Sequence, residues 1–246
     1  MNNLQSHIVS LRNLSIGYEK PLLQNVSIDF PSTGFVGIIG NNGKGKTTLL
    51  KSISGLQEPL SGKILYSGKN IFDLTVADRS KLVSFSFASN QISFPVSVLE
   101  LVAMGRYPYT NHWASLSQED EKIVSHAMEI CGIKNLQNNF VTGLSDGERQ
   151  KAFIAKSLAQ QTHVMLFDEP TAFLDYTSKK HFFQTMQRMA QEEQKLILIS
   201  SHDIDFLTAY ADNLLMIQEN ETIFYNTTPQ IMQTEYFKGH FTKKGV

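Results

Sequence analysis

A glycine-rich stretch carries the strongest chemical signal in the sequence. It reads Gly40-Asn41-Asn42-Gly43-Lys44-Gly45-Lys46-Thr47-Thr48 and fits the spacing G-x-x-x-x-G-K-[ST] at every position. Glycines let the backbone curl so that successive N–H groups point inward, and a following helix start adds partial positive charge. Such a nest attracts phosphate. We therefore expect a phosphate site from Gly40 to Thr48, with Lys46 reaching the β- and γ-phosphates and the Thr47 hydroxyl binding Mg²⁺.

The residues around this stretch fit the same interpretation. An apolar run over residues 35–39 predicts a strand before it, and residues 48–53 predict the start of a helix after it. Strand, glycine loop and helix are the order that the phosphate-binding pattern requires. The alternative is a glycine-rich turn that binds nothing, and it needs both the spacing and the setting to be coincidental.

Acidic residues and a histidine follow two further strands of the expected sheet. Asp168 and Glu169 end an apolar run over residues 164–167, and His202 follows a second run over residues 196–199. In open α/β sheets, ligands gather at the carboxyl ends of the strands. We expect Asp168 to hold Mg²⁺ directly or indirectly, and Glu169 to act as the base that polarises an attacking water. His202 is expected to bond the γ-phosphate, with a purely structural hydrogen-bonding role as the alternative.

The elements that position these residues indicate a single α/β domain. We expect a P-loop-type core with a mixed sheet and an N-terminal antiparallel part, in which residues 7–11 and 13–18 form an N-terminal strand that leads into a turn and residues 22–30 form another strand. Capping boxes at Ser97, Ser117 and Ser145 predict three helix starts. The domain spans residues 1–246, with a core of roughly 1–87 and 159–246 and a helical subdomain inserted over roughly 88–158.

Composition narrows the class of protein. The chain has 246 residues, and its 22 Lys and Arg are balanced by 23 Asp and Glu. It therefore lacks the excess of positive charge that would indicate nucleic-acid binding. The single cysteine, Cys131, is expected to be a small buried hydrophobe. A single cysteine, together with the lack of a charged N-terminal segment followed by an apolar one, favours a location in the reducing cytoplasm. No apolar run approaches the roughly 18 residues of a membrane span, so a membrane role requires a partner.

Aromatic residues at two places leave alternatives open. Tyr18 precedes the glycine loop and could stack on an adenine ring, although a tyrosine in a strand also packs without any ligand. The stretch from Tyr107 to Trp113 is either an exposed contact surface or a loop folded over the helices. We favour the contact surface for this stretch and for the loop before Ser97, and expect both to be exposed.

Four motifs in a fixed order give the chain a family resemblance. They are Gly40 to Thr47, Leu144-Ser145-Asp146-Gly147-Glu148-Arg149-Gln150, Leu166-Phe167-Asp168-Glu169-Pro170-Thr171 with Leu174-Asp175, and Ser201-His202-Asp203. Together they resemble the ATP-binding subunit of an ABC transporter, over nearly the whole chain. The resemblance implies ATP hydrolysis by a head-to-tail homodimer that sandwiches two ATP molecules. It also implies that Tyr18 stacks on adenine, that Ser145, Gly147 and Glu148 face the partner's nucleotide, and that Asp175 couples the two sites.

A narrower resemblance concerns the cargo. Residues 100–108 are similar to the subgroup that serves importers of iron chelates, haem and cobalamin. This resemblance implies two integral-membrane permease subunits, an extracytoplasmic binding protein, and a peripheral location on the cytoplasmic face of the membrane. Two alternatives are a soluble ABC ATPase acting on ribosomes or DNA, and a module that binds ATP as a switch without turnover.

The chain departs from the family pattern at three places. Asp146 stands where the family usually has glycine, and is tolerated only if it points at Arg149 or solvent. Lys44 adds a cation to the glycine loop, either as a nucleotide contact or as a solvated side chain. The family's metal-touching glutamine falls on Ala88, and the candidate Gln91 lies three residues further on. Extended chain covers roughly 10 Å over that distance, so we expect Gln91 not to reach the metal.

Overall fold

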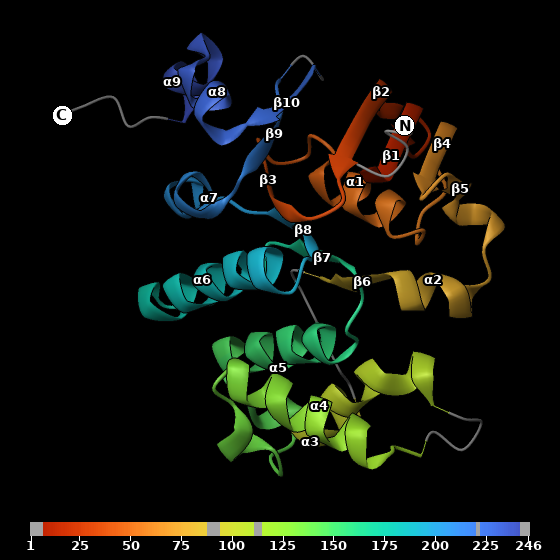
Figure 1. The fold of residues 1–246 in the computed structure, drawn as a ribbon. Coiled ribbons are helices and arrows are strands. Elements are labelled where there is room, and N and C mark those ends of the chain that lie inside the picture. The colour runs from red at the N-terminus through yellow and green to blue at the C-terminus, as the bar shows by residue number, and fades with distance from the viewer. Residues whose placement is uncertain (1–6, 88–93, 111–114, 220–221, 242–246) are drawn as a thin grey trace.

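The computed structural model describes residues 7–87, 94–110, 115–219 and 222–241 (Figure 1). The helices and strands follow the chain in the order β1 (His7–Gly17), β2 (Pro21–Pro31), β3 (Gly34–Gly40), α1 (Lys46–Ile53), β4 (Ser61–Tyr66), β5 (Lys69–Asn70), α2 (Val76–Leu82), β6 (Val83–Ser86), α3 (Val98–Ala103), α4 (Gln118–Ile130), α5 (Asp146–Ala159), β7 (Val164–Asp168), α6 (Tyr176–Glu192), β8 (Leu196–Ser200), α7 (Ile204–Tyr210), β9 (Asn213–Ile217), β10 (Ile223–Thr227), α8 (Thr228–Gln233) and α9 (Glu235–His240). None of the helices in these ranges is long and apolar enough to cross a membrane.

Two sheets organise the strands. The larger has the order β10-β9-β3-β8-β7-β6, in which neighbours pair in parallel except for the antiparallel edge pair of β9 and β10. The smaller has the order β2-β1-β4-β5 and is antiparallel throughout. The expected mixed sheet with an N-terminal antiparallel part is therefore confirmed.

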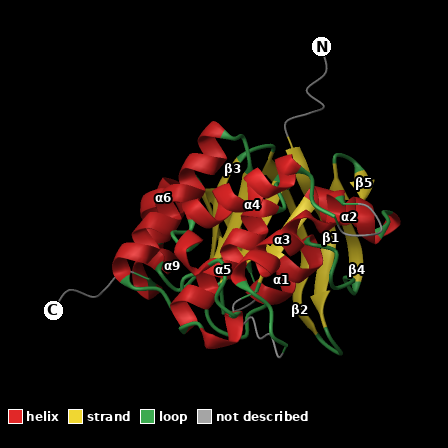
Figure 2. Cartoon of the chain, turned by 90° about the horizontal axis from the view of Figure 1, so that it is seen from below, coloured by secondary structure: helices red, strands yellow, loops and turns green. Residues whose placement is uncertain are grey.

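Strand β3 shows how the layers form, because its alternate side chains enter different cores. Phe35 and Ile39 belong to the core shared with α5, α6 and α7. Val36 and Ile38 belong to the core shared with α1 and the smaller sheet. Since successive side chains of a strand point to opposite faces, the larger sheet is covered on both sides (Figures 1 and 2).

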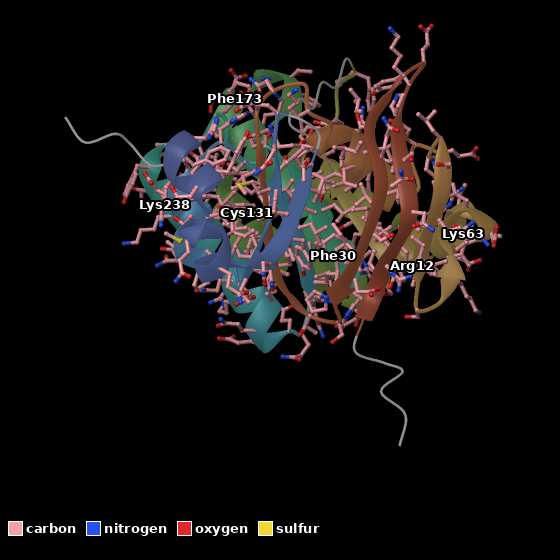
Figure 3. The ribbon with its side chains drawn as sticks, turned by 90° about the horizontal axis from the view of Figure 1, so that it is seen from above. Arg12, Phe30, Lys63, Cys131, Phe173 and Lys238 are labelled. Atoms are coloured by element: carbon pink, nitrogen blue, oxygen red, sulfur yellow. The ribbon has the colours of Figure 1, made fainter. Side chains whose placement is uncertain are left out.

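Aromatic packing joins the two sheets at their edges. The ring of Phe30 in β2 meets Tyr225 in β10 with 5.3 Å between centroids, in an edge-to-face arrangement. Figure 3 shows Phe30 on the side of β2 toward the C-terminal strands, and Lys63 at the outer side of the smaller sheet. The smaller sheet is thus fixed against the larger one through buried side chains.

The three helices α3, α4 and α5 pack together below the larger sheet in Figure 1. All three predicted capping boxes are present: Ser97 with Glu100, Ser117 with Asp120, and Ser145 with Glu148. In each, the serine hydroxyl accepts a hydrogen bond from the third helical N–H, and the acidic side chain accepts one from the serine N–H. The sequence signal therefore located these helix starts correctly.

The N-terminal strand is present as predicted, as β1, and its pairing with β2 is irregular between Leu11 and Leu14, where Asn13 adopts a left-handed backbone with φ of 46°. Other elements differ from the sequence prediction. The short helices α7 and α9 were not predicted. The helix that begins after Ser97, α3, ends at Ala103, and a 3₁₀ helix continues to Tyr109. A Cβ on Gly105 would lie 2.4 Å from the Lys156 carbonyl, so this segment packs closely on α5.

Arg106 is buried in this 3₁₀ segment and anchors it. Its Nε lies 2.8 Å from Asp120 Oδ1, and its Nη1 donates to the Ala159 carbonyl at 2.9 Å. Its guanidinium lies 4.2 Å from the Tyr109 ring centroid. The tyrosines of this segment stay accessible to solvent, since Tyr107 is 51% and Tyr109 40% exposed. The expected exposure is confirmed for these tyrosines and for Phe94, whereas Trp113 lies outside the described residues.

We predict that the Arg106–Asp120 pair controls the stability of the helical layer. Asp120→Ala should lower the free energy of unfolding at pH 7 by about 3 kcal/mol, because it leaves a buried guanidinium unpaired. Hydrogen bonds from Ser117, together with Arg106, lower the Asp120 pKa to about 2. A depressed carboxyl pKa stabilises the fold above the ordinary value of 3.8, and this contribution is lost as pH falls toward the folded-state value.

Urea unfolding at several pH values measures both effects. The difference between the wild type and Asp120→Ala should shrink between pH 4 and pH 2, as Asp120 is protonated in the wild type. The matched control is Asp78→Ala, which removes an exposed carboxylate that accepts from Thr75 at the same position of α2. An equal loss of stability in both variants would contradict the role of the buried pair.

Candidate functional site

The candidate site lies where three neighbouring parallel strands end. Ile38 of β3 is opposite Ser200 of β8, and Ser200 is opposite Asp168 of β7. The loops that follow these strands therefore start at one edge of the sheet. The glycine loop, Asp168-Glu169 and His202 come together there, as the sequence predicted from the strand order.

The glycine loop turns tightly between β3 and α1. Gly40 has φ of 154°, and a Cβ added to it would lie 2.8 Å from the Ile217 carbonyl. Gly45 has φ of 93° and is the residue before α1. Because glycine has no side chain, it cannot cap the first N–H groups of the helix. These N–H groups are left for a ligand, and the helix start adds positive potential to the same place.

Lys46 places a cation inside the loop. Its Nζ donates to the Gly40 carbonyl at 2.7 Å and lies 3.3 Å from the Asn41 carbonyl. Burial lowers the pKa of the amine, and the nearby charges of Glu169 and Asp168 oppose that shift. Two carboxylates at the end of a buried strand need a positive neighbour, and Lys46 provides it.

Asp168 is buried and held by two hydroxyls. The Thr47 hydroxyl donates to Oδ2 at 2.8 Å, and the Ser200 hydroxyl donates to Oδ1 at 2.6 Å. Carboxylate and hydroxyl oxygens are the hard ligands that Mg²⁺ prefers. The sequence analysis predicted Thr47 and Asp168 but missed Ser200, whose position as the last residue of an apolar strand was the available signal.

Glu169 has an unusual backbone and a partly buried carboxylate. Its φ is 46°, and its N–H donates to the Ser200 carbonyl at 3.0 Å. Oε2 accepts from the His202 N–H at 3.2 Å, and the His202 ring Nε2 lies 3.4 Å from Oε1. No described residue donates a hydrogen bond to the buried Oε1, and burial raises the pKa of this carboxyl. An acceptor of this kind is suited to take a proton.

The remaining candidate contacts lie around the loop. Tyr18 follows β1 in the turn before β2 and is 64% exposed, so its ring is accessible for stacking. Asn41, Asn42 and Gly43 are exposed, whereas Thr48 is buried within α1. Lys44 is not a freely solvated side chain, because its amine donates to the Glu219 carbonyl at 2.7 Å. Gln91 and Ala88 lie outside the described residues.

The start of helix α5 is open to solvent. Ser145 is exposed at its end, and its hydroxyl bonds Glu148 Oε2 at 2.7 Å. Asp146 pairs with Arg149, as the sequence analysis required for a carboxylate at this position. Gly147 lies close to the Phe173 carbonyl, which is 3.1 Å from the place of an added Cβ. Asp175 is exposed at the start of α6 and accepts from the Ser178 N–H at 2.8 Å.

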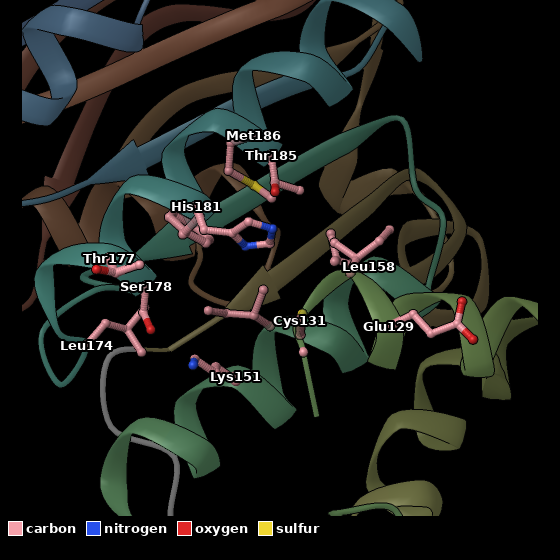
Figure 4. Close-up of a pocket in the computed structure, with 14 residues that line it drawn as sticks. Glu129, Cys131, Lys151, Leu158, Leu174, Thr177, Ser178, His181, Thr185 and Met186 are labelled. Carbon is pink, nitrogen blue, oxygen red and sulfur yellow. The ribbon is translucent and has the colours of Figure 1, made fainter. Parts of the chain in front are cut away.

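A separate cavity of about 350 Å³ lies between α5 and α6 (Figure 4). Lys151, His181 and Cys131 contribute to its lining, with Leu158 and Met186 as part of the apolar wall. The described residues that line it include none of the glycine loop and neither Asp168 nor Glu169. We therefore assign the phosphate chemistry to the strand ends and not to this cavity.

Comparison with known proteins agrees with this geometry. A family model described as ABC transporter matches residues 23–172. The achromobactin transport ATP-binding protein of Dickeya dadantii is 33% identical over 222 residues, which cover 90% of this chain and 82% of that protein. The ferric enterobactin transport ATP-binding protein of Escherichia coli is 32% identical over 223 residues, with coverages of 90% and 82%. A dimeric ATP-binding cassette bound to ADP and Pi matches the fold with a TM-score of 0.81 and 24% identity, covering 90% of this chain and 99% of that chain.

We predict that Lys46→Ala weakens nucleotide binding itself. Loss of a charge-assisted bond to phosphate should raise the dissociation constant for ATP by about tenfold to a hundredfold. Titration calorimetry measures this constant, and Lys63→Ala, which removes an exposed lysine from β4, is the control. An unchanged affinity in a folded Lys46→Ala protein would remove this residue from the phosphate site.

Proposed function

The chain belongs to the ABC transporter family, and on that premise we propose that it powers the import of ferric siderophores, haem or cobalamin. Within the family it is an ATP-binding and ATP-hydrolysing subunit of an importer. The observation that supports the site assignment most directly is the convergence of Lys46, Asp168 and Glu169 at the ends of β3 and β7. Siderophore is the favoured cargo, because similar ATP-binding proteins are named for the transport of achromobactin, of ferric enterobactin and of siderophore.

The glycine loop binds the phosphates of ATP. The N–H groups before and at the start of α1 donate hydrogen bonds to phosphate oxygens. The Lys46 amine gives up its hydrogen bonds to the loop carbonyls and bonds the β- and γ-phosphates instead. Tyr18 stacks its exposed ring on the adenine. The loop fixes the phosphates in position, and fixed position is the larger part of catalysis in phosphoryl transfer.

Mg²⁺ is the cofactor that the Thr47 hydroxyl and the Asp168 carboxylate would hold. When bound, it neutralises charge on the phosphate oxygens. Ser200 keeps the Asp168 carboxylate oriented through its bond to Oδ1. The two hydroxyls already aim at the carboxylate, so little side-chain rearrangement is needed to form the site.

Glu169 and His202 carry out the proton chemistry. Glu169 takes the proton of the attacking water through Oε1, which accepts no hydrogen bond from the described residues, and the raised pKa makes this carboxylate a stronger base than one in water. His202 bonds the γ-phosphate, while its backbone N–H holds Glu169 Oε2. The water oxygen bonds to the γ-phosphorus, and the bond from that phosphorus to the β–γ bridging oxygen breaks.

Hydrolysis requires a head-to-tail homodimer of this chain. The exposed start of α5, with Ser145, Gly147 and Glu148, faces the γ-phosphate bound by the other subunit. The side chain of Asp146 is turned to Arg149, which removes a carboxylate from the path of the phosphate. Asp175, exposed before α6, couples the two sites across the dimer.

The partners are two integral-membrane permease subunits, and an extracytoplasmic binding protein acts through them. The described part of the proposed docking surface comprises the exposed side chains of Phe94, Tyr107 and Tyr109. The subunit works peripherally on the cytoplasmic face of the membrane and binds no nucleic acid. The division into a core and a helical subdomain, roughly residues 88–158, allows the docking surface to move relative to the ATP site.

The cargo is tested in the assembled transporter. The chain, co-purified with its permease and placed in proteoliposomes, should drive ATP-dependent uptake of a labelled ferric siderophore delivered by the binding protein. Labelled haem and labelled cobalamin are measured in parallel. Uptake of none of the three would contradict the proposed cargo class, and ATPase activity that needs a ribosome or DNA would favour the soluble alternative.

We predict that Glu169→Gln retains ATP binding and loses turnover by a factor of about 10² to 10⁴, because it removes the base. The wild-type rate should fall with decreasing pH as Glu169 is protonated, at a pKa that burial holds above its ordinary value of 4.5. The residual activity of the variant should lack this acid limb. Steady-state phosphate release by the transporter checks both statements, and wild-type turnover by Glu169→Gln would remove this residue from the mechanism.

A further inference from the structure

The turn after β9 lies against the glycine loop. Parallel pairing of β3 with β9 places Gly40 opposite Ile217, the last residue of β9. A Cβ on Gly40 would be 2.8 Å from the Ile217 carbonyl, so the two backbones approach closely. Glu219 follows two residues after Ile217 and therefore starts beside the loop that follows Gly40.

Two side chains of the loop bind Glu219. Asn41 Nδ2 donates to Glu219 Oε1 at 3.0 Å, and Lys44 Nζ donates to the Glu219 carbonyl at 2.7 Å. Both belong to the four variable positions between Gly40 and Gly45. Glu219, which lies outside the nucleotide-binding motifs, thus accepts hydrogen bonds from the first and the last residue of this four-residue segment.

The C-terminal helix in turn holds Glu219. The Glu219 N–H donates to the Tyr236 hydroxyl at 3.1 Å. The Tyr236 ring is stacked on the His240 ring, with 4.0 Å between centroids and 13° between planes. Helix α9 therefore fixes the backbone of Glu219 through the Tyr236 hydroxyl.

We propose that Glu219 is a positioning residue for the phosphate-binding loop, and that Tyr236 holds it in place. A glycine-rich loop has many accessible conformations, and ordering it when ATP binds costs conformational entropy. Bonds from Glu219 to Asn41 and Lys44 restrict the loop before ATP arrives. Preorganisation of this kind increases affinity without a new contact to the ligand. The inference rests on the glycine loop being the ATP site.

The test measures ATP affinity and steady-state hydrolysis in three variants of the assembled transporter. Glu219→Ala removes the acceptor of Asn41, and should raise the dissociation constant and KM for ATP by about threefold to tenfold, the effect of one hydrogen bond. The kcat at saturating ATP should stay within about twofold, since Glu219 touches no reacting atom. Glu219→Gln keeps an acceptor for Asn41 and should restore the affinity. Tyr236→Phe should weaken ATP binding in the same direction.

A double-mutant cycle with Asn41→Ala tests the bond from its other side. Because both substitutions remove one interaction, Asn41→Ala/Glu219→Ala should bind ATP no more weakly than the weaker single variant. Additive losses would overturn the proposal, as would an affinity of Glu219→Ala equal to that of the wild type. The control is Glu235→Ala, which removes a carboxylate that is 97% exposed on the same C-terminal helix and should leave affinity unchanged.

The outcomes also separate this inference from the proposed function. A wild-type protein that binds no ATP would contradict the ATP site itself. Wild-type binding together with an unaffected Glu219→Ala would contradict only the positioning role. Loss of kcat and affinity to the same extent in Glu219→Ala and Glu219→Gln would mean that the charge, and not the hydrogen bond to Asn41, determines the effect, and would overturn the inference.

Discussion

The structure of the site depends on the buried carboxylate of Asp168. A carboxylate in this position is costly unless its oxygens are hydrogen-bonded and a cation lies nearby. Hydroxyls from Thr47 and Ser200 satisfy its two oxygens, and the charge of Lys46 faces it from the loop. Asp168 ends β7, Ser200 ends β8, and Lys46 and Thr47 begin α1 after the loop that follows β3, so forming the site requires β3, β7 and β8 to be paired in their native register.

The electrostatics of the neighbouring Glu169 follow from the same arrangement. Its left-handed backbone turns the side chain toward His202, and the N–H of His202 binds one of its oxygens. The other oxygen is buried and has no hydrogen-bond partner within the part of the chain that the structure describes, and burial raises the pKa of the carboxyl. Backbone strain at such a residue is tolerated because the flanking strands fix it. The two adjacent acidic residues thus acquire different properties from their surroundings.

The layer of helices α3, α4 and α5 holds exposed aromatic side chains on a well-anchored backbone. Arg106 is buried against Asp120 and the Ala159 carbonyl, and this anchor holds a segment whose tyrosines remain exposed. An exposed aromatic surface on a fixed backbone can bind a partner with little ordering cost. The capping boxes at Ser97, Ser117 and Ser145 fix where the three helices begin. The same layer thereby presents the start of α5 and the tyrosines as parts of one packed unit.

The sequence by itself determined the local features: the glycine loop, the capping boxes, the apolar strands and the acidic pair after β7. These follow from spacing and residue type over a few positions, where backbone geometry and hydrogen bonding act locally. Tertiary structure alone decided the contacts of Ser200 with Asp168, Arg106 with Asp120, and Glu219 with Asn41 and Lys44. Their partners lie on other elements, so the contacts depend on strand register and helix packing. Neither is encoded in the spacing of neighbouring residues.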